Sequence, residues 1–437
     1  MSTEIVLPVD RNAVAALSRS KNEPAWMAEL RVQALEKAAA LELPKLEKTK
    51  IDRWNISAYG ESTEVNKVSN FADVPAVIRD VLQGDTDTAI NNVIVQHNSG
   101  VIYAQLQQEW ADKGVIFTDL ETAVREHEAL VKPYFMQAVK SDEHQLSALH
   151  TALWNGGVFL YVPKNVELDV PVQAMFYHEQ SSSTFAPHVL IVAESNSRVN
   201  YVDNYISGND TAETVHNGVV EVFVKPRAKV TYASIHHLNQ ATTDITFRRA
   251  IVEQDGQIEW IVGEMNNGNG VSETYSILKW NGSDSDCKVI CVGSGDQKLN
   301  ITTKAVHFGK SSESQMITRA VMREQATAII NGISKIEKGA TKANGQQTER
   351  ILMLSPKARG DANPILLIDE DDVKAGHAAS VGQVNQEQVY YMMSRGISRA
   401  DAENLIIRGF LDPVVSDIPN EQLQALLRRY IERKLGQ

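Results

Sequence analysis

Four short segments decide the fold: Ser197-Arg198-Val199-Asn200-Tyr201, Ala228-Lys229-Val230-Thr231-Tyr232, Gly256-Gln257-Ile258-Glu259-Trp260 and Asp286-Cys287-Lys288-Val289-Ile290. Each is a polar turn followed by apolar residues at alternate positions, the pattern of a short β-strand. The first valine or isoleucine of the strand stands at 199, 230, 258 and 289, in steps of 31, 28 and 31 residues. Such a repeat with little helix inside it predicts the stacked coils of a β-solenoid, with two or more strands per coil, because one coil cannot bury its inner face alone.

An immunoglobulin-like sandwich is the competing interpretation of the same strands. It requires about 100 residues per domain, so two unrelated domains would have to follow one another in this part of the chain. We therefore favour the solenoid.

The hydrophobic pattern changes on both sides of the repeat. From Gly156 onward apolar residues alternate with a period of two, whereas the preceding chain mixes helical spacing with alternating stretches such as Asn92–Gln96. After about residue 382 helical spacing returns. We expect a mainly β protein with three regions: a mixed α/β N-terminal region at 1–155, a solenoid core at 156–382 and a helical C-terminal domain at 383–437.

Capping residues divide the C-terminal domain into helices. Asn385 predicts the start of a first helix and Gly396 its end, while Ser398 predicts the start of a second and Gly409 its end. A third helix is expected beyond Asp417. One interpretation of these helices is a cap that covers the open end of the solenoid; a docking surface for another protein is the other, and both can hold at once.

Composition narrows the functional classes. The 437 residues carry 43 Lys and Arg against 55 Asp and Glu, a formal charge of −12 and a pI near 5.5, which argues against nucleic acid as a partner. Met1-Ser2-Thr3-Glu4-Ile5 lacks a basic stretch followed by an apolar core, and no apolar run approaches the ~18–20 residues of a membrane span. We expect a cytoplasmic protein without a membrane segment.

The motifs of common enzymes are missing from the sequence. It contains no Gly-x-x-x-x-Gly-Lys-Ser/Thr, so the chain is not expected to hydrolyse ATP, and no His-Glu-x-x-His, Gly-x-Ser-x-Gly or Cys-x-x-Cys. We expect a non-catalytic protein. The alternative is a β-helix carbohydrate-active enzyme using the acids Asp369-Glu370-Asp371-Asp372, although four adjacent acids usually form a solvated turn.

Cysteine and histidine offer few metal ligands. Cys287 and Cys291 lie about 13 Å apart if they share a strand at ~3.3 Å per residue, so they cannot hold one ion together and are expected to fill the core. His236 and His237 should point to opposite faces of a strand. His377 stands in the small-residue run Lys374-Ala375-Gly376-His377-Ala378-Ala379-Ser380, which would leave its imidazole accessible.

The C-terminal residues resemble a known family. The segments Pro364–Val373 (PILLIDEDDV), Gly376–Gly382 (GHAASVG), Glu387–Gly396 (EQVYYMMSRG) and Ile406–Phe410 (IIRGF), with Gly157–Pro163 (GVFLYVP) upstream, are similar in order and spacing to the SufB/SufD family of iron–sulfur cluster assembly proteins. The resemblance covers essentially the whole chain, and within the family it is strongest to the SufD type.

The resemblance implies a fold and a set of partners. The fold would be a right-handed parallel β-helix between N-terminal and C-terminal helical regions. A SufB-like subunit would pair with this chain through the β-helix, and a SufC-like ABC-type ATPase would dock on the C-terminal helices. Tyr390, Met393, Arg395, Ile406 and Phe410 are the candidate docking residues, and a homodimer is possible in isolation.

The resemblance also assigns His377 to a cluster site shared with the partner. Many SufD sequences carry a cysteine two residues before this histidine, where Ala375 stands here. The stretch that supplies cysteine in the SufB-type scaffold corresponds to Gln347–Leu352, which has no thiol. Iron–sulfur clusters are held mostly by about four thiolates, so we expect the cluster to be transient, shared with the partner and not bound stably by this chain alone.

Overall fold

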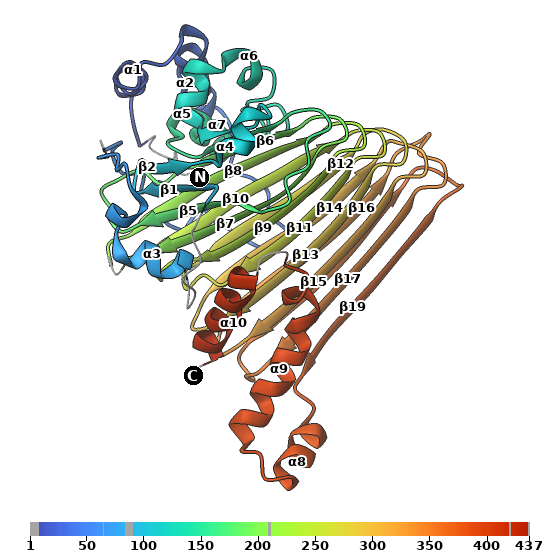
Figure 1. Ribbon diagram of the computed structural model, residues 1–437. Helices are drawn as coiled ribbons and strands as arrows, with labels where there is room; N and C mark the ends of the chain where they lie inside the picture. Colours follow the sequence, from blue (N-terminus) through green and yellow to red (C-terminus); the bar gives the residue numbers. More distant parts are fainter. Residues whose placement is uncertain (1–7, 64, 84–90, 209–210, 419–420, 436–437) are drawn as a thin grey trace.

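The repeated segments form two parallel sheets wound into a solenoid (Figure 1). The computed structural model describes residues 8–63, 65–83, 91–208, 211–418 and 421–435; Met1–Ile5, on which the targeting prediction rests, lie outside them. One sheet contains β5 (Val172–His178), β7 (Arg198–Ser207), β9 (Lys229–His237), β11 (Gln257–Glu264), β13 (Asp284–Gly293), β15 (Glu313–Met322), β17 (Asn344–Met353) and β19 (Lys374–Gln383). The other contains β4 (Val158–Val162), β6 (His188–Ala193), β8 (Thr214–Val224), β10 (Thr242–Val252), β12 (Gly270–Leu278), β14 (Lys298–His307), β16 (Thr327–Ile336) and β18 (Arg359–Ile368).

Each coil contributes one strand to each sheet, and every strand pairs in parallel with its counterpart one coil away. The predicted β-solenoid is therefore confirmed. The immunoglobulin-like alternative is wrong, because its sheets are antiparallel.

The predicted repeat has the correct register in two of its three steps. Val199 pairs with Val230 and Val230 with Ile258, but Ile258 pairs with Ser285 rather than with Val289. The alternation of apolar residues continues for several positions along this strand, so the sequence alone could be aligned four residues out of place. The structural register puts Cys287 opposite Trp260.

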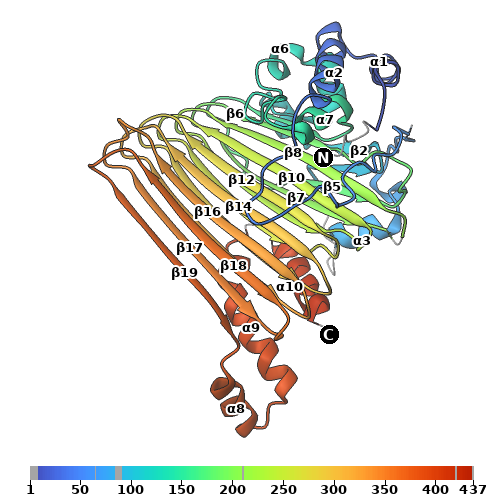
Figure 2. The ribbon, with the colours of Figure 1, turned by 180° about the vertical axis from the view of Figure 1, so that it is seen from behind.

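Apolar side chains form three layers. The inward-facing residues of both sheets make one continuous core between them, which includes Tyr201, Tyr232 and Trp260. The outer face of the β4–β18 sheet packs against the N-terminal helices, and the outer face of the β5–β19 sheet packs against α3, α9 and α10. Near the start of the solenoid each sheet thus packs against the other sheet on its inner face and against helices on its outer face (Figure 2).

The N-terminal region closes the first coil. It contains the following elements: α1 (Arg11–Ser20), α2 (Ala25–Ala38), η1 (Phe71–Asp73), α3 (Ala76–Gln83), β1 (Val93–His97), β2 (Gly100–Gln105), α4 (Gln108–Asp112), β3 (Ile116–Asp119), α5 (Leu120–Glu126), α6 (Glu128–Val131) and α7 (Gln145–Leu153). β1 pairs in parallel with β5, and β2 and β3 then add antiparallel strands to the edges of the two sheets. The sheets of the solenoid therefore continue into part of the N-terminal region. The limits 1–155, 156–382 and 383–437 remain our proposal for the domains.

Three helices follow the last coil: α8 (Gln386–Ser394), α9 (Arg399–Val415) and α10 (Glu421–Leu435). Asn385 caps α8 and Ser398 caps α9, as predicted, and Gly396 follows α8 with a positive φ of 89°. The predicted end of the second helix at Gly409 is wrong, since α9 continues to Val415. Ile407 and Leu411 in this part of α9 are buried against the sheet, and this burial outweighs the low helix propensity of one glycine.

The C-terminal helices cover the side of the solenoid and not its end. α9 and α10 lie on the outer face of the β5–β19 sheet, while α8 projects away from it (Figure 1). The interpretation of these helices as a cap on the open end is therefore wrong. No helix in the described part of the chain is both long and apolar enough to cross a membrane.

Candidate functional site: the open end of the solenoid and the α8–α9 groove

The solenoid ends in two strands whose outer edges are unpaired within the described residues. β18 and β19 are the last members of their sheets, and each is ten residues long. Apolar side chains at this end remain exposed, with Leu367 at 45%, Ile368 at 38% and Val381 at 44%. Unpaired strand edges of this length present a row of free N–H and C=O groups that can pair with another chain.

His377 lies on the edge strand β19 and is exposed. It belongs to a column of inward-facing residues that pair with one another on successive strands of this sheet. The column consists of Tyr201, Tyr232, Trp260, Cys287, Met316, Gln347 and His377. Members of this column below the end are buried. His377 therefore occupies a position that a further coil would enclose.

A buried carboxyl group lies one strand inside this end. Glu349 on β17 is 1% exposed, and its neighbours in register are Thr318 and Ala379. Burial raises the pKa of Glu349 to about 7. Glu349 carries no signal in the sequence, because only the strand register shows that it faces the interior.

Thiols are absent from the described residues at the open end. Cys287 and Cys291 are both buried in the inner core, which confirms their predicted role as core residues. Burial raises the pKa of both thiols, so neither is a ready thiolate.

The acidic run at 369–372 forms the turn between β18 and β19. The Glu370 carboxylate accepts a hydrogen bond from the backbone N–H of Gly339 and lies 3.6 Å from Lys338 Nζ. The Gly339 and Asp371 backbone hydrogen bonds lower the pKa of Glu370. A glycosidase requires one carboxyl group with a raised pKa, so this turn does not favour the carbohydrate-active alternative.

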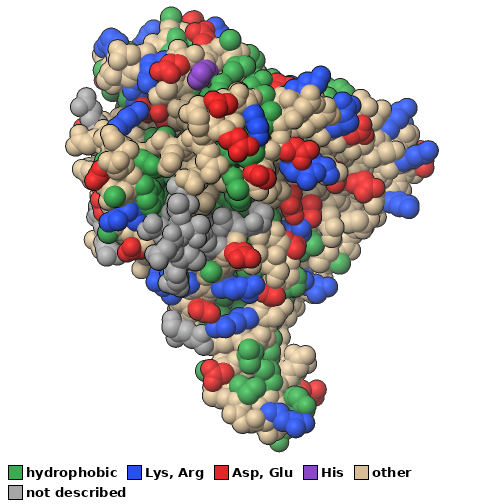
Figure 3. Space-filling view, in the orientation of Figure 1, with side chains coloured by type: hydrophobic (Ala, Val, Ile, Leu, Met, Phe, Trp, Pro, Cys, Tyr) green, Lys and Arg blue, Asp and Glu red, His purple; other side chains and the backbone are tan. Residues whose placement is uncertain are grey.

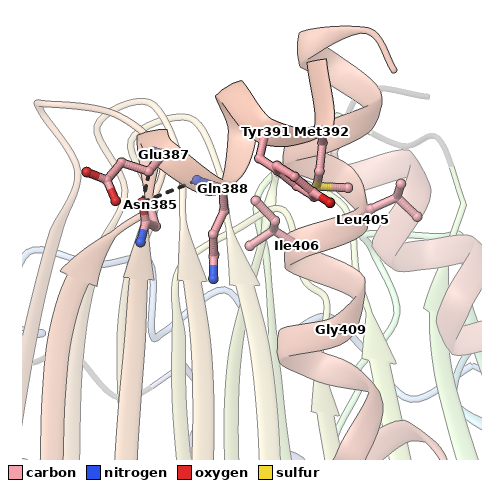
Figure 4. Close-up of a pocket in the computed structure, with 8 residues that line it drawn as sticks. All are labelled: Asn385, Glu387, Gln388, Tyr391, Met392, Leu405, Ile406 and Gly409. Atoms are coloured by element: carbon pink, nitrogen blue, oxygen red, sulfur yellow. Dashed lines mark hydrogen bonds between the residues drawn. The ribbon is translucent and has the colours of Figure 1, made fainter. Parts of the chain in front are cut away.

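A groove of about 640 Å³ lies between α8 and α9 (Figure 4). Eight residues line it: Asn385, Glu387, Gln388, Tyr391, Met392, Leu405, Ile406 and Gly409. Tyr391 is 59% and Leu405 is 48% exposed, and neither was singled out from the sequence. Hydrophobic side chains gather at this projecting end in the space-filling view (Figure 3).

The five candidate docking residues lie in different surroundings. Tyr390, Met393 and Arg395 are exposed on α8 and the turn after it, and Ile406 lines the groove. Phe410 instead packs against the solenoid, where Arg319 lies over its ring and donates a hydrogen bond to its carbonyl oxygen. The structure thus brings Ile406 together with α8 and separates Phe410 from it.

A second cluster of potential ligands lies inside the solenoid. It carries no local sequence signal, because three different strands contribute to it. His216 Nδ1 and His236 Nδ1 lie 2.7 and 2.8 Å from the two carboxylate oxygens of Asp244. Arg248 donates to His236 Nε2 at 2.7 Å, so this nitrogen must accept and Nδ1–H must donate to Asp244. We assign the cluster to a buried hydrogen-bond network. His237 faces outward and stacks on Tyr430, which confirms that the two adjacent histidines point to opposite faces.

Comparison with known proteins agrees with this geometry. The family model described as "SUF system FeS cluster assembly, SufBD core domain" matches residues 176–410, and the "SufBD protein N-terminal region" matches residues 15–174. The iron–sulfur cluster assembly protein SufD of Bacillus subtilis is 48% identical over 98% of both chains. An iron–sulfur cluster assembly SufBD family protein of Staphylococcus epidermidis is 28% identical over 97% of this chain and 93% of its own. The chain therefore belongs to the SufB/SufD family of iron–sulfur cluster assembly proteins and is of the SufD type.

Proposed function

We propose that this chain is the non-catalytic SufD-like subunit of a SUF complex that builds and delivers iron–sulfur clusters. A SufB-like subunit pairs with the open end of the solenoid, and a SufC-like ATPase docks on α8 and α9. The carbohydrate-active alternative is not favoured by the family or by the acidic turn.

The observation that carries this proposal is the position of His377 on an unpaired edge strand. A partner that adds its own strands to β18 and β19 would place its residues beside this imidazole. Because the described part of this end offers no thiol, most of the ligands of a cluster must come from that partner. The cluster is then a shared cargo that leaves the complex, rather than a cofactor of this chain.

The docking of the ATPase is supported by the projecting helices. Tyr390 at 74% exposure and Met393 at 43% are large hydrophobic side chains in water, and the groove beside them is wide enough to accept side chains of another protein. The sequence lacks a nucleotide-binding motif, so energy from ATP must reach the complex through a docked subunit.

Co-expression tests the partnership. This chain, expressed with a SufB-like and a SufC-like protein, should elute from gel filtration as one complex, and His377→Ala should form the same complex but assemble fewer clusters. Recovery of only a monomer or a homodimer would contradict the heteromeric pairing. Unchanged cluster formation in the His377→Ala complex would contradict the role of the imidazole.

A set of surface variants tests the docking face. Tyr390→Asp and Leu405→Asp should abolish capture of the SufC-like ATPase while the far-ultraviolet circular dichroism spectrum is retained, because both side chains are exposed. Trp280→Asp is the matched control, since Trp280 is 40% exposed on a solenoid turn away from α8 and α9. Equal loss of ATPase binding in all three variants would contradict a site on these helices.

A further inference from the structure

The interior of the solenoid changes character toward its open end. The inward column that begins with Tyr201, Tyr232 and Trp260 continues with Gln347 and His377. Apolar packing that stabilises the earlier coils therefore gives way to polar side chains one coil before the end. A polar interior is costly to bury unless its groups are paired.

Glu349 is the least satisfied group in this polar interior. Its Oε2 atom is buried and has no hydrogen-bond partner among the described residues. Its Oε1 atom lies beside Gly332 on the opposite sheet, where a Cβ atom would come within 1.9 Å of it. Glycine at 332 thus makes room for the carboxyl group across the width of the solenoid.

The register places Glu349 close to His377. Gln347 pairs with His377, and Glu349 is the next inward-facing residue along the same strand, paired with Ala379. Diagonal neighbours of this kind have Cα atoms roughly 8 Å apart, which is within reach of long side chains. Ala379 lies on the same face of β19 as His377, and its small side chain leaves the space beside the two groups unfilled by a bulky residue.

The chemistry of these groups selects a class of ligand. A carboxylate and an imidazole are hard and borderline donors, suited to a divalent first-row transition-metal ion. A buried polar atom without a partner requires an explanation, and an ion at the open end would supply the missing partner of Glu349 Oε2. A purely structural glutamate would instead be expected to use both oxygens in hydrogen bonds.

We propose that Glu349 is a second ligand, contributed from the neighbouring strand, for a divalent metal ion that His377 binds at the open end. Gln347 lines the site between them. The proposal rests on the proposed role of His377 and adds that this chain presents a two-residue half-site for a single ion before any cluster forms.

Metal affinity of the full-length chain, free of any affinity tag, tests this proposal. Zn²⁺, and Fe²⁺ without oxygen, are titrated in competition with a chromogenic chelator. We expect one ion per chain, and Glu349→Gln and His377→Ala should each weaken its affinity at least about tenfold, or about 1.4 kcal/mol. Glu349→Asp, which keeps the charge on a shorter side chain, should fall between wild type and Glu349→Gln.

Glu313→Gln is the matched control, because Glu313 is an exposed glutamate on the neighbouring strand of the same sheet; its affinity should equal that of wild type. Wild-type affinity in Glu349→Gln, or no binding by the wild-type chain, would overturn the proposal. Formation of a complex with the SufB-like and SufC-like proteins is measured by gel filtration for wild type and for Glu349→Gln. If the wild-type chain fails to form this complex, the proposed function is refuted instead. Failure of the metal-site proposal and failure of the proposed function are therefore distinguishable.

Discussion

Replacing Glu221 by glutamine should abolish a loss of stability that the wild-type protein undergoes as the pH rises toward neutral. Glu221 on β8 is fully buried, and its carboxyl oxygens accept backbone N–H hydrogen bonds from Met136 (2.6 Å), Ala138 (2.6 Å) and Val139 (3.0 Å). Burial raises the pKa of Glu221 from its ordinary 4.5 to about 7 in spite of these donors. Glu221 thus connects the solenoid to the turn before α7. Below pH 7 its carboxyl group is largely protonated.

Neighbouring histidines show where the proton lies. His150 Nδ1 is 2.8 Å from the carbonyl oxygen of Asn217 and must donate to it, so its Nε2 accepts from His188 Nδ1 at 3.0 Å. His188 Nε2 then carries a lone pair and faces Glu221 Oε2 at 3.2 Å. Burial lowers the pKa of His188 to about 3, so this imidazole is neutral and the proton of the pair is carried by Glu221.

The size of the effect follows from the two pKa values. As pH rises from 4.5 to about 7, the unfolded chain ionises at this position while the folded chain keeps its proton, so the free energy of unfolding falls. The total loss is about 3 kcal/mol, at about 1.4 kcal/mol per pH unit. Glutamine has nearly the same shape and cannot ionise, so Glu221→Gln avoids this pH-dependent loss. Its amide NH2 group cannot accept the Met136 N–H hydrogen bond that Oε2 accepts, and this costs about 1–3 kcal/mol at every pH.

Urea unfolding near pH 4.5 and near pH 7.5, followed by circular dichroism, measures the difference. The difference in unfolding free energy between variant and wild type should shift in favour of the variant by about 3 kcal/mol from the acidic to the higher pH. Glu253→Gln, at a partly exposed ion pair with Lys225, is the control and should not change the pH dependence. An equal destabilisation of Glu221→Gln at both pH values would refute the reasoning, because it would mean that the wild-type protein loses no stability as the pH passes the pKa of Glu221.

Three further predictions concern single features of the fold. Cys287 and Cys291 should not react with a thiol-reactive disulfide reagent until the protein is unfolded, since both are buried with raised pKa values; rapid labelling of the native protein would contradict this. Gly332→Ala should lower the free energy of unfolding by about 1–3 kcal/mol, because the added Cβ atom would meet the Glu349 side chain. Urea unfolding measures this change, and an unchanged midpoint would show that the interior has room for the methyl group. Asn385→Ala should destabilise the start of α8 by about 1 kcal/mol, because the Asn385 side chain caps this helix. Amide hydrogen exchange in the first turn of α8 should become faster, and unchanged exchange would mean that the helix does not need this cap.

The architecture was predictable because its signal is local and repeated. Alternating apolar residues and turn residues recur often enough for one misaligned step, at Ser285 and Val289, to leave the fold prediction intact. The caps at Asn385 and Ser398 are equally local, since one side chain satisfies the N–H groups of the turn beside it.

The placement of the C-terminal helices required information from both faces of a sheet. Segments such as Val289-Ile290-Cys291-Val292 are apolar at every position, the sign of a strand buried on both sides. This pattern would have predicted helices packed on the outer face of the sheet. The apolar spacing within the helices alone does not show whether they pack on the side of the solenoid or on its end. Glu349 carried no such signal, because its burial depends on Gly332 in the opposite sheet.

The two bare strands at the end of the coil stack have a consequence for the life of the free polypeptide. An edge with free N–H and C=O groups can accept strands of unrelated or partly synthesised chains. Pro364, which has no N–H to offer, interrupts only one of the two rows. Newly made molecules are therefore at risk of aggregating through these edges. Substitutions at this end would remove little of that risk, since the groups that invite misassembly belong to the backbone itself.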